Sequence, residues 1–143
     1  MTNSIALLLM SHGTFAHSAM KSAELIIGKQ ENYETVGIDV VDDVDALEQE
    51  MMEKVESLDQ SNGLIILTDI IGGTPTNLAS RLLQNSTTIL VSGLNLPLVL
   101  DVCMNRQMNL DSVVGSLEAA YAQGFTIRTV TDVMGGEEDE YSL

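Results

Sequence analysis

The sequence predicts an α/β fold built on an open, mostly parallel β-sheet with helices on both faces. Short aliphatic runs typical of buried parallel strands alternate with longer stretches of helical periodicity. This alternation favours strand–helix–strand units with right-handed crossovers. We assume the strand order 2-1-3-4, which makes the first and third strands neighbours. The runs expected to form this sheet are residues 5–10, 33–41, 63–67 and 87–92.

Helical periodicity follows the first two runs. From Ala16 onward, apolar or small residues recur on one face of a helix, and Gly28 provides its C-terminal stop. The second helix opens at Asp42 and Asp43, whose negative charges suit the positive end of the helix dipole. Its predicted buried stripe comprises Val44, Leu47, Met51, Met52, Val55 and Leu58.

Further helices are expected in the second half of the chain. Thr74 is a suitable N-cap for a helix with Pro75 at its first position. Another helix follows Pro97, and Asn109 has the character of an N-cap for the next, which Gly124 ends. The predicted buried face of that last helix comprises Leu110, Val113, Val114, Leu117 and Tyr121.

The C-terminal part of the chain has a different character. Residues 125–133 are rich in β-branched side chains but carry Arg128 and Asp132, which predicts an edge strand. Residues 135–143 are acidic, and we expect them to form a flexible tail. No repeat or interdomain linker is visible, so we expect one domain over residues 1–134.

The composition restricts the class of protein. Hydrophobic residues make up 45% of the 143 residues and aromatic residues only 3%, so the core must be aliphatic. No apolar run reaches the roughly 18 residues of a transmembrane helix. The first residues lack the basic region of a secretory signal, and Cys103 is the single cysteine. We therefore expect a cytoplasmic protein without disulfides.

The net charge of −15 disfavours binding to nucleic acid or to anionic membranes. Such an acidic surface attracts a basic protein partner. An equally weighted interpretation is that the acidic residues only keep the protein soluble.

The most informative stretch is residues 68–75. Because it follows a buried strand, Asp69 is expected at the carboxyl end of that strand. Gly72, Gly73 and Thr74 then present free main-chain amides at a helix N-terminus, which can bind an anion.

His12 is the candidate reactive group, since it directly follows the first strand. In the assumed strand order it faces Asp69 where the winding of the sheet reverses, the usual ligand site of such sheets. A carboxylate that accepts the proton of one imidazole nitrogen leaves a nucleophilic lone pair on the other. Beside amides that hold phosphoryl oxygens, His12 can form a transient phosphohistidine. We expect no metal ion and no cofactor.

Other reactive side chains have simpler interpretations. His17 lies near the start of a helix and is expected to be a surface or packing residue. Cys103 lies among apolar helical residues and is expected to be a core thiol. The sequence contains no P-loop, no G-x-G-x-x-G, no G-x-S-x-G and no zinc-ligand spacing.

Three blocks of sequence are distinctive in combination and in this order. They are Met10-Ser11-His12-Gly13, Leu67-Thr68-Asp69 with Gly72-Gly73-Thr74-Pro75 and Asn77-Leu78-Ala79-Ser80-Arg81, and Ser92-Gly93-Leu94-Asn95-Leu96-Pro97. With these blocks the chain resembles the IIA domain of the mannose-class bacterial sugar phosphotransferase system (PTS), also called the EIIA type-4 domain, and the likeness spans residues 4–133.

The resemblance implies a phosphocarrier. The family accepts a phosphoryl group from the carrier protein HPr on the histidine matching His12 and passes it to a IIB component, which serves a IIC/IID permease. Asp69 would orient the histidine, and residues 72–74 would hold the phosphoryl group. The family also implies a homodimer in which residues 126–131 form an exchanged strand. Ile71 departs from relatives with an aromatic residue there, which puts the partner-contacting rim in doubt.

The transported sugar stays open: mannose, fructose, sorbose, an amino sugar and gluconate all fit, because the sugar contacts only the membrane components. A close alternative is the phosphoryl-donor subunit of a dihydroxyacetone kinase. A small metallochelatase would need a second metal-binding cluster. A flavodoxin-like electron carrier would use residues 11–18 as a phosphate loop and would need stacking aromatic side chains.

Overall fold

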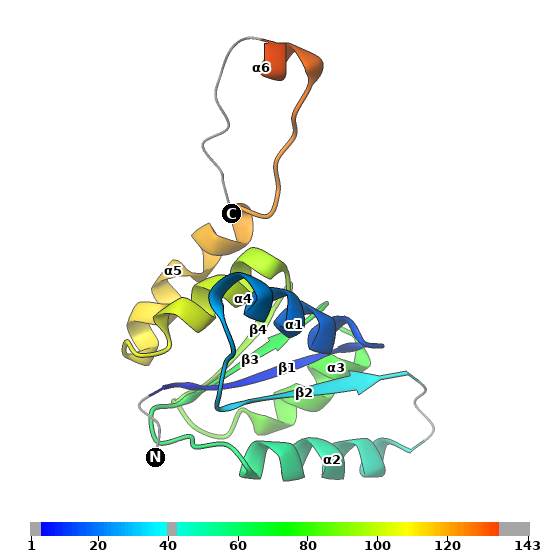
Figure 1. Ribbon diagram of the computed structural model, residues 1–143. Helices are drawn as coiled ribbons and strands as arrows, with labels where there is room; N and C mark the ends of the chain where they lie inside the picture. Colours follow the sequence, from blue (N-terminus) through cyan, green and yellow to red (C-terminus); the bar gives the residue numbers. More distant parts are fainter. Residues whose placement is uncertain (1–3, 40–42, 135–143) are drawn as a thin grey trace.

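The computed structural model describes residues 4–39 and 43–134, and its centre is an all-parallel sheet in the order β2-β1-β3-β4 (Figure 1). The assumed strand order is therefore confirmed. Because β1 and β3 are neighbours, the direction of winding reverses between them. The strands are β1 (Ala6–His12), β2 (Tyr33–Ile38), β3 (Leu64–Thr68) and β4 (Thr88–Ser92).

The predicted helices form close to their expected bounds. Asn95 and Asn109 are N-caps, since their side chains accept hydrogen bonds from the main-chain N–H groups of Leu98 and Ser112, each at 2.9 Å. The helices are α1 (Phe15–Ile27), α2 (Val44–Glu56), α3 (Thr74–Ala79), α4 (Leu96–Asn105), α5 (Leu110–Ala122) and α6 (Val130–Met134), with a 3₁₀ turn, η1 (Ser80–Leu82).

One cap differs from the prediction. Gly73, not Thr74, is the N-cap of α3, and Thr74 is the first helical residue. The extended conformation of Gly73 carries the chain into the helix without a side-chain cap. Pro75 therefore lies one position deeper in the first turn, where its missing N–H is equally harmless.

The sheet separates two aliphatic cores. Side chains alternate across β1 and β3, so that Leu7 and Leu9 pack with α1, α4 and α5, whereas Leu8 and Met10 pack with α2 and α3. All of these side chains are fully buried. Burial on both faces explains why the strands read as continuous aliphatic runs rather than as an alternating pattern.

The predicted buried stripes were too wide. Val44 and Met52 on α2, and Val114 and Tyr121 on α5, are exposed. Periodicity identifies the side of a helix that faces the core, but the width of the contact depends on how closely the helix lies against the sheet.

The predicted C-terminal edge strand is wrong for the single chain. Residues 125–129 have no regular structure, and α6 is a short helix. The segment projects from the end of α5 away from the sheet (Figure 1), with Phe125 and Ile127 exposed. A strand needs a partner for its main-chain groups, and no described strand of this chain pairs with the segment.

Two predicted features lie partly or wholly outside the described residues. The second strand was predicted to reach residue 41, whereas β2 ends at Ile38 and residues 40–42 are not described. The acidic tail, residues 135–143, is also not described. None of the described helices combines the length and apolar character needed to cross a lipid bilayer.

Candidate functional site

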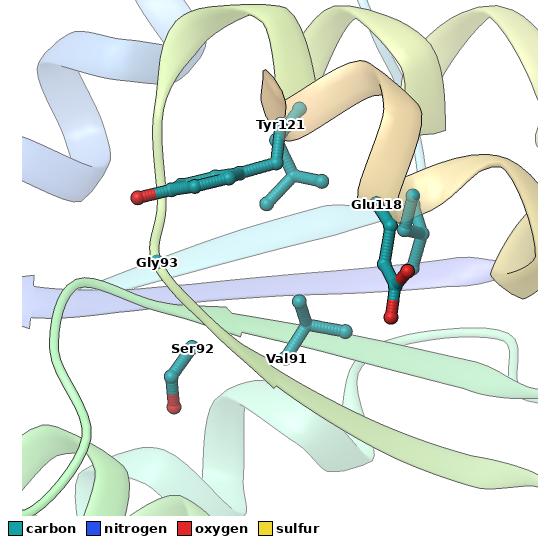
Figure 2. Close-up of a pocket in the computed structure, with 7 residues that line it drawn as sticks. Val91, Ser92, Gly93, Glu118 and Tyr121 are labelled. Carbon is teal, nitrogen blue, oxygen red and sulfur yellow. The ribbon is translucent and has the colours of Figure 1, made fainter. Parts of the chain in front are cut away.

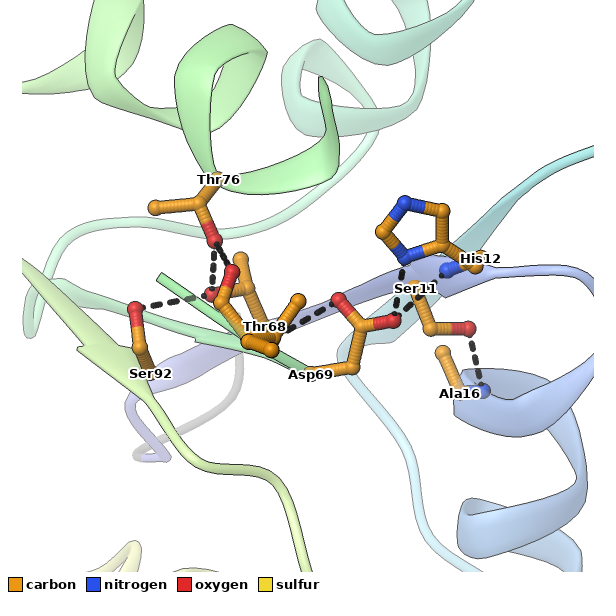
Figure 3. A network of polar contacts seen from close by, with 8 residues as sticks. Ser11, His12, Ala16, Thr68, Asp69, Thr76 and Ser92 are labelled. Atoms are coloured by element: carbon orange, nitrogen blue, oxygen red, sulfur yellow. Dashed lines mark hydrogen bonds and ion pairs between the residues drawn. The ribbon is translucent and has the colours of Figure 1, made fainter. Parts of the chain in front are cut away.

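His12 and Asp69 meet at the carboxyl edge of the sheet, between β1 and β3 (Figure 3). His12 is the last residue of β1, and Asp69 directly follows β3. One carboxylate oxygen, Asp69 Oδ2, lies 2.9 Å from the main-chain nitrogen of His12 and 2.7 Å from its Nδ1 atom. The two candidate residues predicted to face each other are therefore in direct contact.

The hydrogen bonds of Asp69 determine which imidazole nitrogen carries the proton. Burial raises the pKa of the Asp69 carboxyl. Hydrogen bonds from the His12 main chain, the His12 ring and the Ile70 N–H together lower that pKa by more, so the net shift is downward. The carboxylate is ionised at neutral pH and can only accept hydrogen bonds. Nδ1 of His12 must therefore donate, which leaves the lone pair of the neutral ring on Nε2.

The His12 ring is accessible, whereas the carboxylate that holds it is not. The side chain of His12 is 55% exposed and that of Asp69 only 12%. A shielded carboxylate keeps a short hydrogen bond to the ring, while the opposite edge of the ring stays open to a second molecule.

The main chain of Gly73 lies against that open edge. A Cβ atom placed on Gly73 would be 2.8 Å from Cε1 and 3.4 Å from Nε2 of His12. Gly72 has a φ of +84°, in the left-handed region that favours glycine. Neither glycine N–H donates to another described main-chain group, and the Thr74 N–H, in the first helical turn, has no acceptor within the helix.

The loop that carries His12 is fixed by a residue that sequence reasoning passed over. The buried Ser11 hydroxyl accepts a hydrogen bond from the Ala16 N–H at 2.7 Å, which attaches the start of α1 to β1. Gly13 N–H donates to the Ile38 carbonyl of β2 at 2.9 Å. In the sequence Ser11 belonged to the block that contains the candidate histidine and to the alternative phosphate loop, but neither predicted this hydrogen bond.

A second group of missed residues lies behind Asp69, where the hydroxyl groups of Thr68, Thr76 and Ser92 are joined by hydrogen bonds (Figure 3). Thr68 is the one polar residue of β3, and this departure from an aliphatic strand was the signal that could have identified it. The other two come from separate segments, and their meeting is a tertiary feature.

The remaining reactive side chains lie elsewhere. His17 is exposed on α1, and its Nδ1 atom is 3.5 Å from the Thr35 hydroxyl of β2. Burial raises the pKa of the Cys103 thiol to about 11, so Cys103 is protonated at neutral pH and is not a nucleophile. Within residues 4–39 and 43–134, no three His, Cys, Asp or Glu side chains form a group that could hold a metal ion.

A cavity of about 390 Å³ lies between β4 and α5 (Figure 2). Its walls are mainly apolar, and Tyr121 lies over Gly93. Its lining includes Val91, Leu98, Leu117 and Tyr121, with Ser92 and Glu118 as polar members. Neither His12 nor Asp69 lines this cavity, so it is separate from the reactive pair.

The sequence is similar to that of sugar PTS components. Residues 6–119 match the family model EIIA-man, described as "PTS system fructose IIA component". The PTS system mannose-specific EIIAB component of Escherichia coli (strain K12) is 29% identical over 103 residues, which are 71% of this chain and 32% of that protein. The PTS system fructose-specific EIIA component of Bacillus subtilis (strain 168) is 25% identical over 125 residues, 86% of each chain.

The fold is also similar to that of solved PTS IIA proteins. The PTS IIA protein associated with the fucose utilization operon of Streptococcus pneumoniae is 28% identical, with a TM-score of 0.73 over 92% of this chain and 96% of that one. The chain spans about a third of the length of the mannose-specific EIIAB relative.

Proposed function

Because the chain belongs to the EIIA-man family of PTS IIA components, we propose that it is the IIA phosphocarrier of a sugar phosphotransferase system. In this proposal His12 accepts a phosphoryl group from phospho-HPr in the cytoplasm and passes it to a IIB component. The observation that carries the proposal is the contact between Asp69 Oδ2 and His12 Nδ1, which directs the free lone pair to the exposed Nε2 atom. The relatives are named for different sugars, so we propose no particular one.

The transfer step follows from this arrangement. The Nε2 lone pair of His12 attacks the phosphorus atom, and the bond between phosphorus and the donor's histidine nitrogen breaks, with its electron pair returning to the donor ring. Phosphorylation at Nε2 makes the His12 ring cationic while Nδ1 keeps its hydrogen. The neighbouring Asp69 carboxylate stabilises that charge. In the second transfer a nucleophile of IIB attacks the phosphorus atom, and the bond to His12 Nε2 breaks with its electron pair returning to the His12 ring.

We assign the phosphoryl oxygens to the main-chain amides of Gly72, Gly73 and Thr74. The support for this assignment is the contact of Gly73 with the Nε2 edge of the ring and the free N–H groups before α3. Amides at a helix start carry partial positive charge and favour an anion. The absence of a side chain at Gly73 leaves room for the phosphoryl group beside the ring.

The proposal is tested by phosphorylation in solution. The purified protein is incubated with phosphoenolpyruvate, enzyme I and HPr, and an acid-labile phosphate on His12 is sought by mass spectrometry. His12→Ala is expected to take no label, whereas His17→Ala, which changes the chain's other histidine, is expected to label normally. Normal labelling of His12→Ala would end the proposal.

We also propose that the protein is a homodimer in which residues 126–131 add as a strand to β4 of a second copy. The start of α6, which begins at Val130, would unwind in that exchange. In the described part of the chain, β4 pairs only with β3, so the outer edge of β4 is open. The apolar side chains of Ile127 and Val130 are each 73% exposed, which is costly unless another surface covers them. The division into a domain of residues 1–134 and a tail stays a prediction.

Sedimentation of the wild-type chain and of Ile127→Asp tests the exchange. The wild-type chain is expected to sediment as a dimer, and the variant as a folded monomer, because a buried aspartate at the new interface would be unpaired. A charged substitution in the same segment but at an already polar position, Thr129→Asp, serves as the control. A monomeric wild-type chain would exclude the exchange.

A further inference from the structure

A chain of hydroxyl groups lies behind the reactive pair, at the carboxyl end of β3 (Figure 3). Thr68 is fully buried and Thr76, on α3, is 6% exposed. Their Oγ1 atoms are 2.7 Å apart, and the Oγ atom of Ser92 on β4 lies 3.1 Å from Thr68 Oγ1. The strands β3 and β4 and the helix α3 are thus joined through side-chain oxygens.

The number of hydrogens on each hydroxyl determines which group donates in each of these hydrogen bonds. The Thr76 hydroxyl lies 2.5 Å from the Ile70 carbonyl oxygen, and it must donate because a carbonyl only accepts. A hydroxyl has one hydrogen, so Thr68 must donate to Thr76. The hydrogen of Thr68 is then in use, and Ser92 must donate to Thr68. The order Ser92 to Thr68 to Thr76 to the Ile70 carbonyl is the only one that satisfies every bond.

The last of these hydrogen bonds, from Thr76 to the Ile70 carbonyl, fixes the residue whose N–H binds Asp69. The Ile70 N–H donates to Asp69 Oδ1 at 2.9 Å, so both main-chain polar groups of Ile70 are engaged. On the other side of Asp69, the Thr68 carbonyl accepts hydrogen bonds from the N–H groups of Gly93 and Leu94, each at 2.9 Å. Asp69 therefore lies between two residues whose main chains are fixed.

We propose that Thr68 and Thr76 are positioning residues, which hold Ile70 so that Asp69 keeps His12 in the tautomer with hydrogen on Nδ1. This inference rests on the proposed function, since the tautomer matters only if Nε2 is the nucleophile. The two hydroxyls act through Asp69 and do not touch the phosphoryl group. Their burial also keeps them away from the surface of a partner protein.

Thr76→Val separates positioning from packing, because valine keeps the shape of threonine and removes only the hydroxyl. The variant leaves the Ile70 carbonyl without its donor and the Thr68 hydroxyl without its acceptor. The chain has two histidines, so ¹⁵N NMR in a His17→Gln background reports the His12 ring alone. At about pH 8, where a typical imidazole is neutral, we expect wild-type protein to show one tautomer and the variant to show a mixture.

The transfer kinetics provide a second readout. We expect Thr76→Val to lower the maximal rate of phosphorylation by phospho-HPr about 10- to 100-fold, because a small displacement of a reacting group has effects of this size. The KM for phospho-HPr should not change, since the substituted side chain is buried. Thr76→Ser, which restores the hydroxyl, should restore both the rate and the single tautomer.

Thr88→Val is the matched control. Thr88 is a buried threonine, 7% exposed, at the opposite end of β4, where its hydroxyl donates to Asn85 Oδ1 at 3.2 Å. The same substitution there should cost comparable stability without altering the His12 spectrum or the rate. A change of tautomer in Thr88→Val would mean that general loosening, not the hydroxyl chain, governs His12.

The proposal is overturned if folded Thr76→Val keeps the wild-type tautomer and rate, or if Thr76→Ser is as impaired as Thr76→Val. If Thr76→Val does not fold, Ser92→Ala provides the test, because it removes the first donor of the series at a half-buried site. We expect Ser92→Ala to shift the tautomer ratio in the same direction by a smaller amount. An unchanged ratio would reject the proposal. A tautomer shift without any phosphorylation of wild-type protein would instead contradict the proposed function and leave the hydroxyl chain standing.

Discussion

A single oxygen atom of Asp69 accepts hydrogen bonds from two nitrogen atoms of His12, one in the main chain at 2.9 Å and one in the ring at 2.7 Å. The main-chain bond fixes where β1 ends, and the ring bond fixes the direction in which the imidazole points. Position and protonation of the ring are thus controlled by one group.

Asp69→Asn should slow phosphoryl transfer about 100-fold or more, because the orientation and tautomer of a catalytic histidine depend on its acceptor. An amide has one oxygen and one NH₂ group, so at least one of the donors from His12 and Ile70 would face another donor. Rapid-quench kinetics with phospho-HPr measure the loss, and circular dichroism checks the fold. A variant with the wild-type rate would show that the carboxylate charge is dispensable.

The same carboxylate should make stability depend on pH. Its pKa is lowered in the folded protein, so its stabilising contribution is fully present above its unfolded value of about 4 and is lost as the pH falls through the folded value. Urea unfolding of wild-type protein and Asp69→Asn, compared at several pH values from neutral to acid, measures this contribution. The advantage of the wild type should shrink below about pH 4; an advantage independent of pH would contradict the prediction.

Gly73→Ala should abolish most phosphorylation while leaving the fold intact. The added methyl group would lie 2.8 Å from His12 Cε1, so the ring or the loop must move. The backbone of Gly73 is extended, so alanine adds no backbone strain there. Gly115→Ala on α5 is the control, because its new methyl group meets no atom within 4 Å; it should label normally and gain up to about 1 kcal/mol of stability. Normal labelling of Gly73→Ala would show that the close approach is unimportant.

Arg106→Met should destabilise the fold by about 3 kcal/mol or more, since hydrogen bonds to charged groups are the strong ones. The buried guanidinium donates to the carbonyls of Ile5, Glu31 and Asn32, at 2.9, 2.6 and 2.5 Å, and so ties the starts of β1 and β2 to the end of α4. Chemical denaturation measures the loss. Arg106→Lys should recover only part of the lost stability, because an ammonium group cannot reproduce the planar arrangement of donors of a guanidinium. Full recovery would show that the positive charge alone is sufficient for this stabilisation.

The site was predicted in its main residues but not in its support. His12 and Asp69 were identifiable because each directly follows an aliphatic run, and the glycines because they precede a helix. The hydroxyl chain was not predictable, since Thr68, Thr76 and Ser92 are ordinary polar residues until the fold brings them together. The exposure of Met52 and Tyr121 was missed for the same reason, because burial depends on the neighbouring element.

By itself the sequence determined the four strands of the sheet, the helices α1 to α5 and most of their caps, because side-chain shape, periodicity and capping act over a few residues. It also identified His12 as the candidate phosphoryl acceptor. Only the tertiary structure decided that two nitrogen atoms of His12 bond to one oxygen atom of Asp69, 57 residues away. It also decided that residues 125–129 have no partner strand among the residues that the structure describes. Those features depend on strand order and register, which are set by the packing of the whole chain rather than by any local stretch.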